Sequence, residues 1–153
     1  MTTQELILEL FNGLKSALPD IPVFLDSDGK IVRNAVTPDK NLSLNPDCVE
    51  EALADVGKAV IVCARATTRT AVDASHPCTL RRISIPVEVR TRQLGDDDDG
   101  ISVSVSEMLD QVEAAIGALE TADITDWELG QSGEYENKAG WGYCVAEHLY
   151  QLK

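Results

Sequence analysis

The 153-residue sequence has no long hydrophobic run and no recognisable export signal. Its longest uninterrupted apolar segment, Ala59–Ala64, is only strand-sized, whereas a membrane-spanning helix needs about 18 or more apolar residues. The first residues, Met1 to Glu5, lack the basic segment that opens a secretory signal peptide. We therefore expect a cytoplasmic protein without a membrane span.

Basic residues are half as numerous as acidic ones. The chain has 13 Lys and Arg against 26 Asp and Glu, which gives a formal net charge of −13. Nucleic-acid backbones and anionic membranes both attract Lys and Arg. Aromatic side chains, on which single-stranded bases stack, make up only 5% of the residues. The composition therefore predicts no direct nucleic-acid partner and no membrane partner.

Spacings typical of metal sites are also missing. None of the four cysteines belongs to a CxxC pair; they are Cys48, Cys63, Cys78 and Cys144. The segment from His76 to Cys78 is too short for the usual pair of zinc ligands. Asp26–Gly29 begins like a calcium loop, but Thr37 stands where the loop needs a bidentate glutamate. We expect reduced, buried thiols, no bound metal and no cofactor.

The sequence contains no decisive catalytic motif. It lacks both the GxSxG elbow and the glycine-rich phosphate loops. Ser75 and His76 are adjacent, and so are Glu147 and His148. Neighbours in a strand point to opposite faces, so Glu147 and His148 are not a natural acid–base pair. We predict no catalytic residue and no enzyme activity.

The chain does contain clear patterns of helices and strands. Apolar residues at helical spacing predict helices at Thr3–Leu18, Pro46–Val56 and Ser104–Glu120. The first and last of these begin with capping-box signatures. Two apolar runs around an Asp/Gly-rich turn predict a hairpin at Ile21–Val32. Ala59–Ala64 predicts a central strand that is buried on both faces. The expected buried stripe of the second helix is Val49, Leu53 and Val56.

The clearest strand pattern lies between residues 82 and 92. One set of side chains is expected to face a core: Ile83, Ile85, Val87 and Val89. The other set faces away from it: Arg82, Ser84, Glu88, Arg90 and Arg92. Because Pro86 has no backbone N–H, this strand is expected to lie at an edge, carry a bulge or leave that position unpaired. Arg65–Pro77 is expected to be a loop or the end of a long hairpin.

The remaining segments complete the expected fold. Gly95–Gly100 is predicted to be a solvated acidic loop. Ile124–Leu129 predicts a short strand, Gly130–Gly140 a polar loop and Trp141–Leu152 a long closing strand. The predicted fold is a single α+β domain over residues 1–153. It has two layers, with a mostly antiparallel sheet of four to six strands and two main amphipathic helices on one face.

The charge is unevenly distributed along the chain. Residues 58–92 hold seven basic and two acidic residues, a net charge of +5. The other six basic and 24 acidic residues give the remainder a net charge of −18. Two interpretations stay open: these arginines pair with acids within the chain, or they support head-to-tail self-association. Under the second interpretation we expect salt, and charge reversal at Arg82 or Arg90, to weaken association.

At the level of pattern, the layout resembles the tail terminator (tail completion) proteins of long-tailed bacteriophages and prophages. The segments that carry the resemblance are Thr3–Leu18, Ile83–Arg92, Gly95–Gly100, Ser104–Leu119, Ile124–Leu129 and Trp141–Leu152. The hairpin Ile21–Val32 and the helix Pro46–Val56 make the first half longer than this family pattern.

The resemblance implies a structural role without catalysis. Such proteins form homo-oligomeric rings, typically hexamers, that cap the tail tube and join it to the head. The implied partners are copies of the same chain, the tail tube and the head–tail connector proteins. The implied locations are the cytoplasm of the bacterial host and the virion. The expected interface residues are Arg65, Arg69, Arg82, Arg90, Arg92, Asp96, Asp97, Asp98 and Asp99.

A second hypothesis is a small α+β ligand-binding domain or enzyme. Its site would be a cleft near His148, lined also by Tyr143 and Trp127. An apolar pocket that contains His148 and a convergent carboxylate would favour this hypothesis.

Overall fold

The computed structural model describes residues 2–27, 30–33, 47–72, 80–91, 98–119, 127–134 and 140–151. The helices are α1 (Thr3–Ala17), α2 (Asp47–Asp55) and α3 (Asp98–Gly117), with one 3-10 turn, η1 (Ala64–Ala66). The strands are β1 (Val23–Ser27), β2 (Lys30–Arg33), β3 (Lys58–Cys63), β4 (Thr68–Ala71), β5 (Leu80–Thr91), β6 (Glu128–Glu134) and β7 (Trp141–Gln151).

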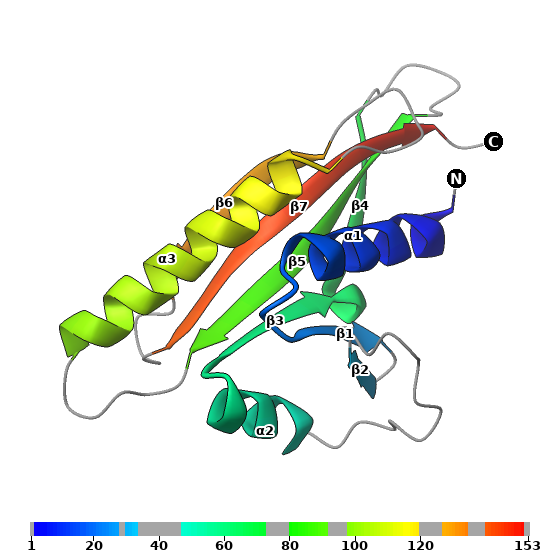
Figure 1. Ribbon diagram of the computed structural model, residues 1–153. Helices are drawn as coiled ribbons and strands as arrows, with labels where there is room; N and C mark the ends of the chain where they lie inside the picture. The colour runs from blue at the N-terminus through cyan, green and yellow to red at the C-terminus, as the bar shows by residue number, and fades with distance from the viewer. Residues whose placement is uncertain are drawn as a thin grey trace.

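The strands form one mixed, mostly antiparallel sheet in the order β2-β1-β3-β5-β7-β6. β1 and β3 are parallel, and the other pairs along this order are antiparallel. Figure 1 shows the long strands β5 and β7 side by side, with α3 running nearly along β6 and β7 and α1 at an angle to it, both in front of the sheet. The expected α+β class, with two main helices on a mostly antiparallel sheet, is confirmed.

The main core lies between this sheet and the helices α1 and α3. The alternating set of β5 points into it, since Ile83, Ile85, Val87 and Val89 are fully buried. The predicted apolar stripes of both helices also lie in the core. Those of α1 are Leu6, Ile7, Leu10, Phe11 and Leu14; those of α3 include Met108, Leu109, Val112, Ala115 and Ile116. Helical and strand periodicity therefore identified the core correctly.

The capping box that was predicted for α1 is present. The Glu5 backbone N–H donates to Thr2 Oγ1, and the Thr2 N–H donates to Glu5 Oε2. These bonds satisfy two of the N–H groups that a helix start leaves without intrahelical partners.

β5 lies inside the sheet, and Pro86 occupies an interruption on one side of it. β3 pairs with residues Val87–Thr91 of β5, and β4 pairs with residues Arg81–Ser84. Pro86 falls between the two registers, while β7 runs past it without a break. Of the three expectations for this proline, an unpaired position on one side is therefore the one that the structure shows.

The opposite face of the sheet carries a smaller core under α2. Val49 and Ala52 of α2 pack on Phe24, Ala59 and Ile61. β3 therefore has buried side chains on both faces, as its continuous apolar run predicts. The expected stripe of α2 is only partly correct. Val56 lies beyond the last helical residue and is 48% exposed, because the chain turns at Gly57, whose φ is +84°.

The start of α3 differs from the prediction. The helix begins at Asp98, so Asp98–Gly100 is helical and Ser104 lies inside the helix instead of capping it. Carboxylates in a first turn are stabilised by the positive end of the helix dipole. Asp98 and Asp99 occupy that first turn. The acidic segment that was predicted to be a solvated loop is therefore also compatible with the start of a helix.

The penultimate strand was also misplaced. β6 covers Glu128–Glu134, so Gly130–Glu134 is strand instead of loop. Side chains from β7 lie across its glycines. A β-carbon on Gly130 would lie 2.8 Å from Glu147 Oε1, and one on Gly133 would lie 3.4 Å from Tyr143 Cε1. Pairing with β7, interrupted by an irregularity between Leu129 and Ser132, outweighs the low strand propensity of glycine.

β4 realises one of the two expectations for Arg65–Pro77. Thr68–Ala71 pairs antiparallel with Arg81–Ser84, so this part of the segment is the end of a long hairpin. Other expectations fall outside the described residues. These are the loop portion at 95–97, the segment at 124–126, and the residues Asp28, Gly29, Thr37, Ser75, His76, Cys78, Arg92, Asp96 and Asp97.

Candidate interaction surface

Half-buried side chains of β5 and β7 form a continuous surface on the side of the sheet opposite α1 and α3. We call this surface the open face. From β5 it contains Arg82, Ser84, Pro86, Glu88 and Arg90; from β7 it contains Trp141, Tyr143, Val145, Glu147 and Leu149. Within the described part of the chain, α2 packs on this side against β1 and β3, and no α-helix packs on this side of β5 and β7.

At one end of the open face, Arg90 contacts both an acid and an aromatic ring. Its Nε lies 3.1 Å from Glu88 Oε1, and these two side chains are only 23% and 14% exposed. The guanidinium carbon lies 3.6 Å from the centre of the Trp141 ring, which is directly opposite across the β5–β7 register. Stacking of this kind stabilises by about 0.5–2 kcal/mol. The cluster therefore holds an arginine and a tryptophan in fixed positions.

At the other end of the open face, two polar side chains contact Glu147. Arg82 Nε lies 4.0 Å from Glu147 Oε2, and Ser84 Oγ donates to Glu147 Oε1 at 3.4 Å. Both contacts are long, and the Arg82 side chain is 43% exposed. An exposed pair with this geometry adds little stability. Between the two polar ends, Pro86 faces Val145 across the sheet.

The structure does not gather the predicted interface arginines into one patch. Arg82 and Arg90 lie on the open face, but Arg69 is opposite Ile83 in the β4–β5 register and so lies on the other side of the sheet. Arg65 is exposed on η1. The helical backbone of Asp98 and Asp99 begins α3; their side chains, like Arg92, Asp96 and Asp97, lie outside the described residues.

Internal pairing, the first interpretation of the positive charge, holds for two of the predicted interface arginines. Arg82 and Arg90 have acidic partners within the chain, Glu147 and Glu88. Neither Arg65 nor Arg69 forms an ion pair with any other described residue, and both are exposed. Reversing Arg90 would break an internal cluster. The exposed pair Arg65 and Arg69 is therefore a cleaner probe of association than the Arg82 or Arg90 reversals that the sequence suggested.

The residues of the alternative cleft do not share one surface. His148 is 1% exposed and opposite Ile83, within the main core. Its ring centre lies 5.0 Å from that of Trp127, which is also buried. Tyr143 belongs to the open face, on the other side of the sheet. A catalytic or ligand-binding role for these three side chains together gains no support from this arrangement.

The two cysteines whose side chains are described are protonated thiols at neutral pH. Burial raises the pKa of the Cys63 thiol to about 12, and the negative charges of Glu88 and Asp26 add to the shift. Burial also raises the pKa of Cys144 to about 12, with a smaller contribution from Glu113. A thiol needs its thiolate form to act as nucleophile or metal ligand. Both side chains therefore act as small apolar groups in the packing.

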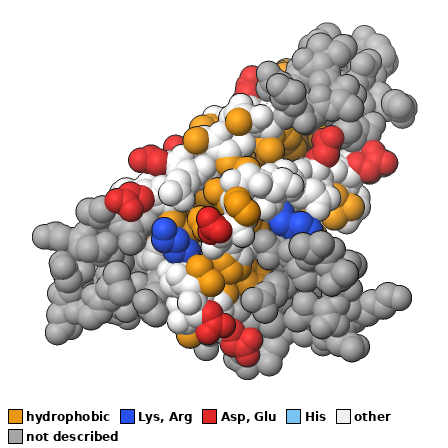
Figure 2. Space-filling view, viewed as in Figure 1, with side chains coloured by type: hydrophobic (Ala, Val, Ile, Leu, Met, Phe, Trp, Pro, Cys, Tyr) orange, Lys and Arg blue, Asp and Glu red, His pale blue; other side chains and the backbone are white. Residues whose placement is uncertain are grey.

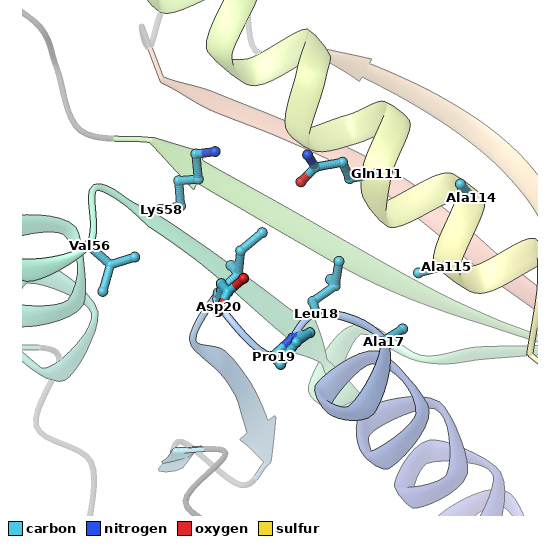
Figure 3. A pocket seen from close by; sticks show the side chains of 10 residues that line it. Ala17, Leu18, Pro19, Asp20, Val56, Lys58, Gln111, Ala114 and Ala115 are labelled. Atoms are coloured by element: carbon cyan, nitrogen blue, oxygen red, sulfur yellow. The ribbon is translucent and has the colours of Figure 1, made fainter.

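A hollow of about 670 Å³ opens beside α3 on the helix-covered side of the molecule. It is lined by Ala17, Leu18, Pro19, Asp20, Ile21, Val56, Lys58, Gln111, Ala114 and Ala115. Figure 3 shows the Lys58 ammonium and the Gln111 amide pointing toward one another across it, with Leu18 rising from the end of α1. Sequence patterns did not indicate this hollow, because its lining comes from three separate segments.

Charge on the helix-covered side is dispersed. Figure 2 shows acidic side chains scattered over this view, with apolar areas between them and few basic groups.

The sequence alone did not predict the pairing of Arg90 with Trp141. The signal for it was the shared alternation of the two strands, which identifies the partners only once the register is known.

No protein-family model matches this sequence, and no curated protein matches it. Among the described helices, none is long and apolar enough to cross a membrane. In the same described segments, no three His, Cys, Asp or Glu side chains are grouped so that they could hold a metal ion. The interpretation of function therefore depends on the fold and on the surfaces that the described residues form.

Proposed function

We propose that this protein is a structural component of a tailed phage or prophage virion. It forms a homo-oligomeric ring, a hexamer in the family it resembles, that caps the tail tube and joins it to the head. In this proposal the protein acts without catalysis or nucleic-acid contact. Its partners are copies of itself, the tail tube and the head–tail connector, first in the bacterial cytoplasm and then in the virion.

The observation that carries this proposal is the open face of β5 and β7. Protein interfaces are enriched in Trp, Tyr and Arg, with apolar residues at the centre and polar groups at the rim. The open face has Trp141, Tyr143 and Val145 in a row, with ion pairs toward its two ends. Because no described α-helix packs over the open face, this surface suits a partner protein.

The order of the elements adds support. An N-terminal helix, a long alternating strand, a long helix and two paired closing strands occur in the order on which the resemblance depends. The exposed Arg65 and Arg69 add charge that is available to an acidic neighbour.

The test is the oligomeric state of the wild-type protein and of matched variants. Sedimentation velocity over a range of concentrations should show a discrete oligomer, and electron microscopy should show rings. Val145→Lys places a charge at the centre of the open face and should shift the protein toward smaller species. Leu8→Lys, at a 39% exposed position on α1, is the control and should leave the oligomer intact.

Two results would contradict the proposal. One is a wild-type protein that stays strictly monomeric at high concentration, at both low and moderate salt. The other is a wild-type oligomer that Val145→Lys leaves unchanged, because self-association would then not use the open face. Circular dichroism of each variant establishes that a loss of assembly is not a loss of folding.

A further inference from the structure

The two flanks of α3 present different surfaces. On the flank toward α1, Gln111, Ala114 and Ala115 border the hollow. On the flank toward β6, Glu113 lies close enough to Cys144 for its charge to act on that thiol. Cys144 is opposite Ser132 of β6. One side of the helix is therefore concave, and the other lies beside the edge strand of the sheet.

The β6 flank carries an exposed apolar side chain and an acid on the same side of the sheet. Leu129 is 44% exposed although it is opposite Ala146, on the helix-covered side of the sheet. Glu113 is half-buried on the same side and forms no ion pair with a described residue. We call Leu129 and Glu113 together the ridge. Exposed apolar surface with polar groups around it is typical of contact surfaces on proteins.

The hollow offers the complementary properties. Its base consists of apolar and small side chains, among them Leu18, Ile21 and Ala115, which are at least nine-tenths buried. Lys58 lies on the same side of β3 as Val60 and Val62, half-buried, and forms no ion pair with a described residue. Asp20, at the rim, is exposed, so water screens its charge more than that of Lys58.

We infer that the ridge of one copy docks into the hollow of the next copy, with Leu129 entering the hollow and Glu113 approaching Lys58. The ridge and the hollow lie on opposite flanks of one helix, so the contact is head-to-tail. Such a contact repeats from copy to copy and closes into a ring when the rotation allows. This inference rests on the proposed self-association and adds the ridge and the hollow to the contact that the open face makes.

Other exposed apolar side chains fit the hollow less well. Val56 already belongs to its lining. Leu8 lies on the outer surface of α1. Val72 follows the end of β4, whose last residues are opposite Arg81 and Arg82, so its surroundings would bring further positive charge toward Lys58. Among the exposed large apolar side chains of the described residues, Leu129 is therefore the one accompanied by a negative charge, that of Glu113, which is opposite in sign to Lys58 in the hollow.

A charge exchange tests the contact. Lys58→Glu alone and Glu113→Lys alone should each raise the dissociation constant of self-association at least about tenfold, since opposing like charges at an interface is costly. The double variant places the reversed charges opposite each other again and should recover to within about threefold of wild type. Glu107→Lys, at an exposed position of α3, is the control for the change in net charge.

A steric variant tests the hollow without changing charge. Ala114→Trp fills the hollow from its exposed rim and should weaken self-association by a similar factor. Ala118→Trp, one helical turn further along and outside the lining, is the matched control. Each dissociation constant is measured by sedimentation equilibrium, and near-UV circular dichroism checks the folding of each variant.

The possible outcomes separate this inference from the proposed function. A wild-type protein that never associates contradicts the proposed function and the docking together. A wild-type oligomer that Lys58→Glu, Glu113→Lys and Ala114→Trp leave unchanged contradicts only the docking of ridge into hollow. Loss in both single charge variants without recovery in the double variant also contradicts it, because the two charges would then not face each other.

Discussion

A β-carbon added at Gly142 would collide with α3. An ideal β-carbon there lies 2.9 Å from Val105 Cγ1, 3.1 Å from Leu109 Cδ1 and 3.3 Å from the carbonyl oxygen of Gly133. Favourable carbon–carbon contacts lie at about 3.5–4.0 Å. Gly142→Ala therefore requires the Val105 and Leu109 side chains of α3 to move away from β7 by several tenths of an ångström.

The expected cost follows from two opposing effects. Forcing an extra carbon into a packed core costs about 1–3 kcal/mol. Replacing glycine by alanine lowers the conformational entropy of the unfolded chain, which stabilises the folded protein by about 0.4–1 kcal/mol. The net prediction is a loss of about 1–2 kcal/mol in the free energy of unfolding. For a chain of this size the melting temperature falls by about 2–4 °C per kcal/mol.

The matched control is the same substitution at the end of α3. A β-carbon on Gly117 meets no atom within 4 Å, so Gly117→Ala should stabilise the protein by about 0.4–1 kcal/mol. Both variants are measured by urea unfolding, followed by circular dichroism, in dilute protein. Adding Val105→Ala to Gly142→Ala should cost less than the sum of the single changes. A Gly142→Ala protein as stable as wild type would refute this close approach of β7 to α3.

Three further changes test other parts of the structure. Arg90→Gln leaves the mostly buried Glu88 carboxylate without its partner and should cost about 1–3 kcal/mol in urea unfolding; adding Glu88→Gln should recover most of it, and no recovery would contradict the pairing. Cys63 and Cys144, with the other two cysteines replaced by serine, should not react with a thiol reagent at pH 8 until the protein unfolds. Their pKa values are raised to about 12 in the folded state, so their contribution to stability is complete below pH 9 and is lost as the pH rises toward 12. Thr2→Ala removes one bond of the capping box and should lower stability by about 0.5–2 kcal/mol; an unchanged midpoint would argue against that cap.

Periodicity predicted the elements whose side chains alternate between core and surroundings. The stripe of α1 and the alternating residues of β5 are buried as expected, because burial of apolar area is what fixes these elements. Continuous apolar character likewise identified β3 as a strand between two cores. For these segments, local sequence and tertiary packing favour the same structure.

The sequence was less informative where pairing with another strand, or the position in a helix, determines the local structure. β6 contains two glycines and forms a strand because β7 pairs with it and places Glu147 and Tyr143 across them. The start of α3 was missed because adjacent carboxylates are compatible with both a solvated loop and the first turn of a helix. Pro86 was consistent with three arrangements until the ends of β3 and β4 were known.

The candidate surface was harder to predict than the fold. Its arginines were correctly placed on the outward side of β5, but the register determines which acids and rings they contact. Arg69 falls on the opposite side of the sheet from Arg82 because β4 joins β5 with Arg69 facing Ile83. A count of charges along the chain contains no information on which strands pair.

The salt dependence of assembly distinguishes the two sources of attraction. Each copy carries a net charge of −13, so copies repel one another over a distance set by the Debye length, about 30 Å at 0.01 M salt and about 8 Å at 0.15 M. Charges in contact, such as Lys58 against Glu113 of the next copy, are screened much less over this range. Arg82 and Arg90 already have partners within the chain, which leaves less unpaired positive charge for salt to screen. If apolar contacts on the open face and in the hollow drive assembly, raising salt from 0.01 to about 0.15 M should strengthen it. Weakening throughout this range would instead indicate that the exposed Arg65 and Arg69 drive assembly, as the charge distribution along the sequence first suggested.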